Sequence, residues 1–167
     1  LRPIFNRLKR KGYVRDHPFT LSMVRQKMLW ELLAEHGRKV GIVNWWHSWP
    51  APELPGFVVS DRVHYRRSEA RHRAAGDLAR SRLVHPPHLA EHIMQRVINP
   101  LDLSCAAYRQ FMKLDDATIR NMRDVHYVRH QLMSEFKYLY AMDMSVKGIA
   151  LDCLEQFSQP DFLALYF

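Results

Sequence analysis

Residues 41–61 read GIVNWWHSWPAPELPGFVVSD, and they hold three tryptophans and three prolines between two short apolar runs. The first run is KVGIVN at 39–44, and the second is FVVSD at 57–61. β-Branched residues dominate both runs, which favours buried strands. A helical pattern, TLSMVRQKMLWELLAEHG at 20–37, leads directly into the first strand. A strand entered straight from a helix is typical of α/β proteins.

The helix predicted at 20–37 has recognisable signals at both ends. Thr20 or Ser22 can cap its start, because their hydroxyls can accept a hydrogen bond from a free backbone N–H. Gly37 can end it in the left-handed conformation. Helix and strand together make one helix-then-strand unit at about 22–44.

The same order recurs at the end of the chain, at about 145–167. Apolar residues recur there at helical spacing and predict one stripe along a final helix; they are Val146, Ile149, Ala150, Cys153, Leu154 and Phe157. The run DFLALYF at 161–167 follows, and such continuous apolar runs belong to parallel strands buried on both faces. We therefore expect an α/β fold with helices on both faces of a sheet.

The segment 62–141 between these units predicts a mostly helical insert. Its first part, to about residue 84, is rich in arginine and indicates a surface excursion. Helices are then expected over 88–97, after two prolines that suit a first turn, and over 103–114. Asp115 or Asp116 can cap a third helix, and helical character continues with breaks to about residue 141.

The chain of 167 residues carries a formal charge of +8, which suits an anionic partner. Basic residues gather at 1–15, which has no acid, and at 62–82. Nucleic acid is an unlikely partner, because no known nucleic-acid motif is present and only Tyr65 interleaves the second basic run. No apolar run is long enough to predict a transmembrane segment. Two distant cysteines form no metal or redox motif and indicate core positions.

Histidine pairs occur at the same helical spacing in two places but form no recognised metal motif. His88 and His92 are four residues apart, as are His126 and His130. Zinc can use such a pair, yet no HExxH glutamate lies between the members and no third ligand is evident. Surface positions are the better interpretation of both pairs. The chain also lacks a GxSxG elbow, a Walker loop and a GxGxxG loop.

The tryptophan loop is the candidate site. In open α/β sheets, ligands bind beyond the carboxyl ends of the strands, and this loop follows such an end. A packed hydrophobic lid is the equally weighted alternative, since Trp rings bury large areas. Ser60 and Asp61 end the second strand and face the same edge, although no base for a serine nucleophile is visible. The expected substrate-pocket wall is formed by Asn44, Trp45, Trp46, His47, Trp49, Pro50, Ser60 and Asp61.

Residues 29–62, LWELLAEHGRKVGIVNWWHSWPAPELPGFVVSDR, resemble the type I phosphodiesterase/nucleotide pyrophosphatase family of the alkaline phosphatase superfamily. The family stretch has the form LWxIL…GxxVxVVxWWxTWPAExxxGxxVSDR. His47-Ser48 departs from the usual small residue and Thr, and Pro52-Glu53 displaces the acid by one position. The final QPDFLALYF is also similar to a family strand. The matching residues are Leu29, Trp30, Leu33, Gly37, Val40, Val43, Trp45, Trp46, Trp49, Pro50, Ala51, Gly56, Val59, Ser60, Asp61 and Arg62.

The resemblance implies part of a three-layer α/β/α alkaline-phosphatase-like hydrolase. Such enzymes cleave phosphodiester or pyrophosphate bonds of nucleotide-like small molecules, with a Thr or Ser nucleophile and two divalent metal ions, usually zinc. In the family, the nucleophile and the first metal-binding Asp precede the region that matches Leu1. The next metal ligands follow the strand that matches 162–167. No catalytic or metal residue is therefore carried over to this sequence.

Both ends of the sequence indicate a partial domain. It begins on Leu1 rather than Met, and it ends within an apolar strand-like run. We therefore expect one partial domain, 1–167, from the central part of a larger phosphohydrolase, inactive by itself. Two alternatives remain: a basic, non-catalytic module that binds a polyanion, and a degenerate family member that serves as a scaffold.

Overall fold

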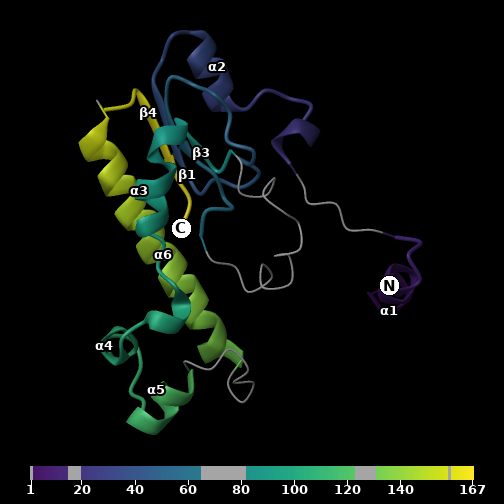
Figure 1. Ribbon diagram of the computed structural model, residues 1–167, viewed down its shortest axis with the longest axis vertical. Coiled ribbons are helices and arrows are strands. Elements are labelled where there is room, and N and C mark those ends of the chain that lie inside the picture. Colours follow the sequence, from purple (N-terminus) through teal and green to yellow (C-terminus); the bar gives the residue numbers. More distant parts are fainter. Residues whose placement is uncertain (1, 15–19, 65–81, 123–130, 158) are drawn as a thin grey trace.

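The computed structural model describes residues 2–14, 20–64, 82–122, 131–157 and 159–167 (Figure 1). These residues form a mixed α/β structure with one four-stranded sheet. The strands are β1 Val40–Val43, β2 Gly56–Val59, β3 Val84–His85 and β4 Phe162–Leu165. The α-helices within the described residues are α1 Arg2–Arg10, α2 Leu29–Glu35, α3 Ala90–Gln95, α4 Cys105–Arg109, α5 Asp116–Met122 and α6 Gln131–Gln156.

The sheet has the order β3-β2-β1-β4. β1 runs parallel to β2 and to β4, with Val43 level with both Val59 and Leu165. The short β3 pairs antiparallel with β2. The predicted parallel pairing of the two helix-then-strand units is therefore confirmed.

β1 and β4 differ in how deeply they are buried. All four residues of β1 are buried, as a central parallel strand requires. β4 was expected to be buried on both faces, and this is wrong in the described structure. It lies at an edge of the sheet, where Leu163 remains 38% exposed, because β1 alone pairs with it among the described residues.

Helices pack on both faces of the sheet. On one face, Val40, Ile42 and Val58 pack with Trp30 of α2. On the other face, side chains of the alternate strand positions, such as Val43 and Val59, pack against α3 and α6. This division follows from the strand period of two, which sends successive side chains to opposite faces. Figure 1 shows α3 and α6 running together beside the sheet.

α2 begins nine residues later than the pattern predicted. Residues 21–23 form a 3₁₀ turn after Thr20, and the α-helix begins at Leu29. The Glu31 carboxylate fixes this start by accepting a hydrogen bond from the Met28 backbone N–H, at 2.7 Å. The predicted end is confirmed, because Gly37 adopts φ +72° and follows the last turn.

α6 is one continuous helix of 26 residues, so the expected break near residue 141 and the separate last helix are wrong. Ser145 lies buried within this continuous helix. Its hydroxyl donates to the Ala141 carbonyl at 2.6 Å and accepts from the Ile98 N–H at 2.9 Å. The buried serine is thus satisfied inside the helix. α6 joins the sheet core to a second cluster, which contains Tyr108, Ile119 and Ala141 (Figure 1).

The described part of the predicted insert also contains β3, which the helical expectation missed. The helix predicted at 88–97 is the shorter α3, preceded by a 3₁₀ turn at Pro87–Leu89. The helix predicted at 103–114 is the shorter α4. Asp115 caps α5 by accepting from the Thr118 N–H at 2.8 Å, and this bond is the main reason that the pKa of Asp115 is lowered. The arginine-rich stretch 65–81 lies outside the described residues.

Candidate functional site

The carboxyl ends of three parallel strands lie at one edge of the sheet. β1 leads into Asn44, β2 into Ser60, and β4 into Tyr166. The residues predicted for the pocket wall all follow β1 or β2 at this edge. Tyr166, which the sequence did not single out, joins them from β4. Strand direction makes this edge the place where an α/β sheet would hold a ligand.

Asn44 ties the three strand ends together. Its backbone N–H donates to the Val59 carbonyl at 2.9 Å, and its side-chain Nδ2 donates to the Tyr166 carbonyl at 2.8 Å. Its φ of +57° turns the chain sharply as it leaves the sheet. Asparagine tolerates this left-handed conformation and also carries the amide donor, so it suits the position on both counts.

Ser48 holds the loop to the end of β2. Its hydroxyl donates to the Trp45 carbonyl at 2.6 Å and accepts from the Asp61 N–H at 3.1 Å. The Asp61 carboxylate in turn accepts from the His47 N–H at 3.4 Å. Ser48 is fully buried, so it is a supporting residue of the loop. The sequence pattern did not indicate this role, because the hydroxyl of Ser48 joins Trp45 to Asp61, which lies 13 residues further along the chain.

Aromatic rings form a connected row along the edge. Trp45 lies edge-on to Trp30 of α2, with centroids 6.0 Å apart, and edge-on to Tyr166 at 6.3 Å. The ring centroids of Trp46 and Tyr166 lie 5.6 Å apart, with the rings tilted against each other. Trp30 is buried, whereas Trp46 is 56% exposed. The row therefore has a packed base at Trp30 and an exposed rim at Trp46.

Trp49 and Pro50 make different contacts from the other tryptophans. The guanidinium of Arg62 lies 3.9 Å from the centroid of the Trp49 ring, a cation–π arrangement. The Trp49 carbonyl accepts from the Leu21 N–H at 2.7 Å. After Pro50, Ala51 donates its N–H to the Arg82 carbonyl at 2.7 Å. This part of the loop is thus held by the 3₁₀ turn before α2 and by the residues before β3.

Several buried polar atoms of the loop and its surroundings have no hydrogen-bond partner within the described part of the chain, among them Asn44 Oδ1, Ser60 Oγ and the Nε1 atoms of Trp30 and Trp49. The side chains of Asn44 and Ser60 are only 3% and 0% exposed. Buried polar atoms are normally paired, and ordered water commonly supplies the missing bond. Asn44 and Ser60 follow directly on the paired residues Val43 and Val59. Ser60 is too deeply buried here to act as an exposed nucleophile.

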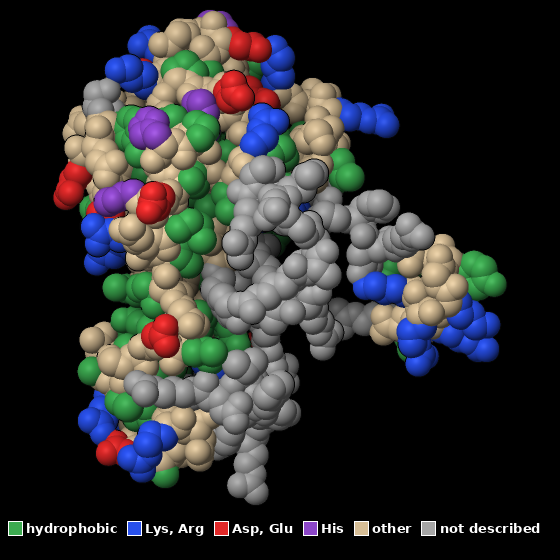
Figure 2. All heavy atoms as spheres, in the orientation of Figure 1, with side chains coloured by type: hydrophobic (Ala, Val, Ile, Leu, Met, Phe, Trp, Pro, Cys, Tyr) green, Lys and Arg blue, Asp and Glu red, His purple; other side chains and the backbone are tan. Residues whose placement is uncertain are grey.

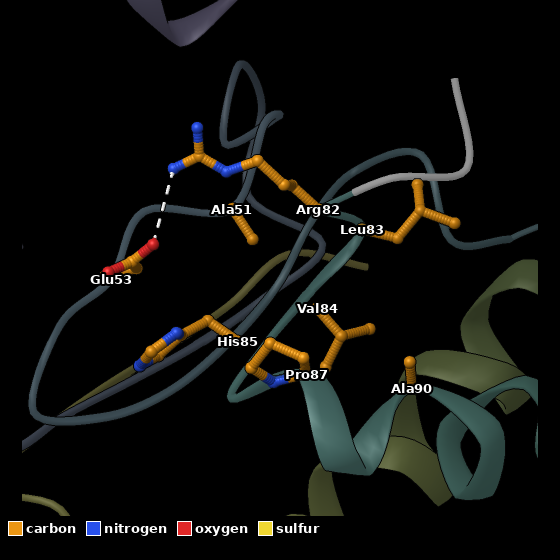
Figure 3. Close-up of a pocket in the computed structure, with 8 residues that line it drawn as sticks. All are labelled: Ala51, Glu53, Arg82, Leu83, Val84, His85, Pro87 and Ala90. Carbon is orange, nitrogen blue, oxygen red and sulfur yellow. Dashed lines mark ion pairs between the residues drawn. The ribbon is translucent and has the colours of Figure 1, made fainter. Parts of the chain in front are cut away.

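A small pocket lies at the β3 edge, beyond the tryptophan loop (Figure 3). Its volume is about 120 Å³, and mostly apolar side chains line it. Arg82 and Glu53 form an ion pair at its rim, with the charged atoms 4.0 Å apart and both side chains well exposed. Such exposed pairs contribute little energy. The pocket is thus mostly apolar, with two of its polar side chains paired to each other at the rim, and the loop edge remains the better candidate.

The histidines that the structure describes do not gather into a metal site. His92 on α3 lies 3.0 Å from the Asp152 carboxylate of α6, and Arg96 pairs with the same carboxylate. These bonds hold α3 against α6. No group of three or more His, Cys, Asp or Glu suited to a metal ion occurs among the described residues. His126 and His130 lie outside them.

Cys153 is a core residue rather than a reactive thiol. Its side chain is only 2% exposed, between α6 and the sheet. Burial, with a smaller contribution from the charge of Asp152, raises the pKa of the Cys153 thiol to about 12. A thiol with this pKa stays neutral at physiological pH and is a poor nucleophile.

No family model, curated protein or solved structure matches this chain. No described helix combines the length and hydropathy that crossing a membrane requires. The strand-end edge, with the residues gathered there, is the candidate functional site of the described structure.

Proposed function

We propose that this chain forms the substrate-binding wall of a metal-dependent hydrolase that cleaves phosphodiester or pyrophosphate bonds. The parent enzyme would belong to the type I phosphodiesterase/nucleotide pyrophosphatase family, which residues 29–62 resemble. One observation carries the proposal: the Trp/Pro loop lies where three parallel strands end, the usual ligand edge of an α/β sheet. The loop is thus both the most family-like stretch and the best-placed one.

The exposed rim of the aromatic row supports a nucleotide-like substrate. Trp46 and Tyr166 are in contact and present 56% and 38% of their surfaces to solvent. Flat rings of this kind bind planar or apolar groups by stacking. Asn44 and Ser48 keep the loop in place beneath them. In this proposal, the chain binds and orients the substrate and supplies no reacting group.

The described residues do not fit a two-metal centre. His47 and Asp61 are joined through the His47 backbone N–H, and no group of three ligands exists around them in the described structure. We therefore derive no catalytic step through metal ions from this chain. The proposal places the nucleophile and the two divalent ions, usually zinc in the family, with residues outside these 167.

The proposed setting is an alkaline-phosphatase-like sheet of which β1, β2 and β4 form a part. Helices on both faces of the described sheet support it. The exposed Leu163 at the β4 edge also suits a sheet that continues. Chain 1–167 would then be a partial domain.

The coding sequence on either side of Leu1 and Phe167 tests the proposal first. We expect an Asp and a Thr or Ser nucleophile upstream, and an Asp and His cluster soon after Phe167. The full-length product with zinc should hydrolyse bis(p-nitrophenyl) phosphate, whereas the 167-residue chain should not. A coding sequence that lacks the expected nucleophile and metal ligands would refute the proposal. A coding sequence that begins at Leu1 and ends at Phe167 would refute it as well.

A substitution in the full-length product then tests the wall. Trp46→Ala should raise KM about tenfold with little change in kcat, because stacking on one aromatic ring contributes roughly 1–3 kcal/mol per base. Phe111→Ala is the matched control, since Phe111 is 60% exposed on a distant helical cluster. Equal effects from both substitutions would remove Trp46 from the binding site.

A further inference from the structure

The first helix, α1, has two chemically distinct faces. Ile4, Phe5 and Leu8 fall within an arc of about 100° on a helical wheel. Arg7, Lys9 and Arg10 occupy the rest of the circumference. A narrow apolar stripe bordered by basic residues is the pattern of a helix that lies in an interface.

The apolar face of α1 is open to solvent. The exposed fractions are 65% for Ile4, 47% for Phe5 and 38% for Leu8. Tyr13, just after the helix, is 76% exposed. Figure 1 shows α1 standing apart from the sheet and the other helices, and Figure 2 shows Lys and Arg side chains gathered there beside hydrophobic ones.

The charge of this segment is concentrated and one-sided. Residues 1–15 contain six of the 25 basic residues of the chain and no acid. The other 19 basic residues stand against 17 acidic ones, so most of the net charge of +8 belongs to these 15 residues. A strongly anionic partner is the complement of such a segment.

We propose that α1 binds the surface of a membrane that contains anionic phospholipids. Ile4, Phe5 and Leu8 enter the boundary between headgroups and acyl chains, and the basic residues lie among the lipid phosphates. A second copy of α1 is a poorer occupant, because pairing would bring two segments of like charge together. Nucleic acid would neutralise the basic residues but leave the apolar face in water. A lipid surface satisfies both faces.

Flotation of the 167-residue chain with vesicles tests the proposal. Vesicles of phosphatidylcholine with about 30% phosphatidylserine should carry the protein, and pure phosphatidylcholine vesicles should carry far less. Arg7→Gln with Arg10→Gln should weaken partitioning by roughly 30-fold, since each basic residue near an anionic surface contributes a factor of about five. Phe5→Ser with Leu8→Ser should weaken it about tenfold or more.

Matched variants at other positions distinguish binding through α1 from nonspecific binding of exposed basic or apolar side chains. Lys113→Gln with Arg120→Gln changes two exposed basic residues, and Leu139→Ser with Leu151→Ser changes two exposed apolar ones. Both pairs should float like the parent chain, and far-UV circular dichroism should be unchanged in every variant used. Equal loss from these controls, or absence of flotation with the anionic vesicles, would overturn the proposal. Binding to duplex DNA that survives Phe5→Ser with Leu8→Ser, without vesicle binding, would also overturn it.

Discussion

Gly56, the first residue of β2, allows β1 and β2 to pair at their observed register. It lies opposite Val40 of β1 and adopts φ +105°. A Cβ at this position would come within 2.1 Å of the Val40 carbonyl oxygen, and within 3.0 Å of the Val40 C and N atoms. These atoms belong to the backbone of a buried central strand, so no side-chain rotation can relieve the clash. Gly56→Ala must therefore push the two strands apart where they begin to pair.

The cost of Gly56→Ala has two parts. Backbone strain at a φ that L-residues rarely adopt contributes roughly 1–3 kcal/mol. Separation of the strands also disrupts the hydrogen bond from the Val40 N–H to the Pro55 carbonyl, now 2.8 Å long, and buried unpaired groups cost about 1–3 kcal/mol. The free energy of unfolding should thus fall by about 4 kcal/mol. With a urea dependence of roughly 2 kcal/mol per molar, the midpoint should fall by about 2 M.

Urea unfolding followed by tryptophan fluorescence measures this loss, because Trp30 is buried beside β1. Two other glycines provide controls, since an added Cβ would meet no atom within 4 Å at either position. Gly37→Ala, at φ +72°, should lower the free energy of unfolding by only about 1–2 kcal/mol, because it adds left-handed backbone strain but no clash. Gly148→Ala, inside α6, should raise the free energy of unfolding by up to about 1 kcal/mol, because Ala has the higher helix propensity. If Gly56→Ala costs no more than Gly37→Ala, the strand-clash argument is wrong.

Three further predictions concern other contacts of the described structure. Ser48→Ala should lower the free energy of unfolding by about 1–3 kcal/mol in urea titrations, because the partly buried Asp61 N–H loses its acceptor at the fully buried Ser48; no loss would contradict this role. Asp152→Ala should cost about 1 kcal/mol by the same measurement, since its partners on α3 are partly exposed; an unchanged midpoint would show that the pairing is energetically neutral. Cys105 should react with a thiol reagent at pH 8 in the folded chain, whereas Cys153 should react only after unfolding; equal rates would contradict its burial.

The raised pKa of Cys153 predicts the direction in which the stability of the fold changes at alkaline pH. The folded-state pKa is about 12, above the ordinary thiol value of 9.0, so unfolding favours ionisation of this thiol. The resulting contribution to stability is fully present below about pH 9 and is lost as the pH rises towards 12. In Cys153→Ala, this part of the alkaline decline in the urea midpoint should be absent.

Local sequence patterns predicted the elements whose form depends on near neighbours. The β-branched run at 39–44 contains β1, the run at 57–61 contains β2 except for its first residue Gly56, and the later apolar run contains β4. Gly37 ends α2 as predicted, because only its own φ decides that end. The order of helix and strand likewise indicated parallel pairing, since two such units return the chain in the same direction.

Elements that depend on distant partners were predicted poorly. α6 is held in place by contacts that are distant in sequence, such as the hydrogen bond from the Ile98 N–H to the Ser145 hydroxyl, which spans 47 residues. β3 is only two residues long and exists because β2 offers it an edge. Hydrophobic periodicity along the sequence gives no information about such contacts.

The sequence by itself determined that Asn44 to Pro50 form a strand-end loop, and it selected Ser60 and Asp61 as neighbours. The tertiary structure alone decided that Tyr166, 122 residues from Asn44, completes the same edge and that Ser48 fastens the loop to Asp61. It also decided which tryptophan faces solvent and which is buried. The physical reason is that secondary structure follows from local sterics and periodicity, whereas a site is made where strands distant in sequence end side by side.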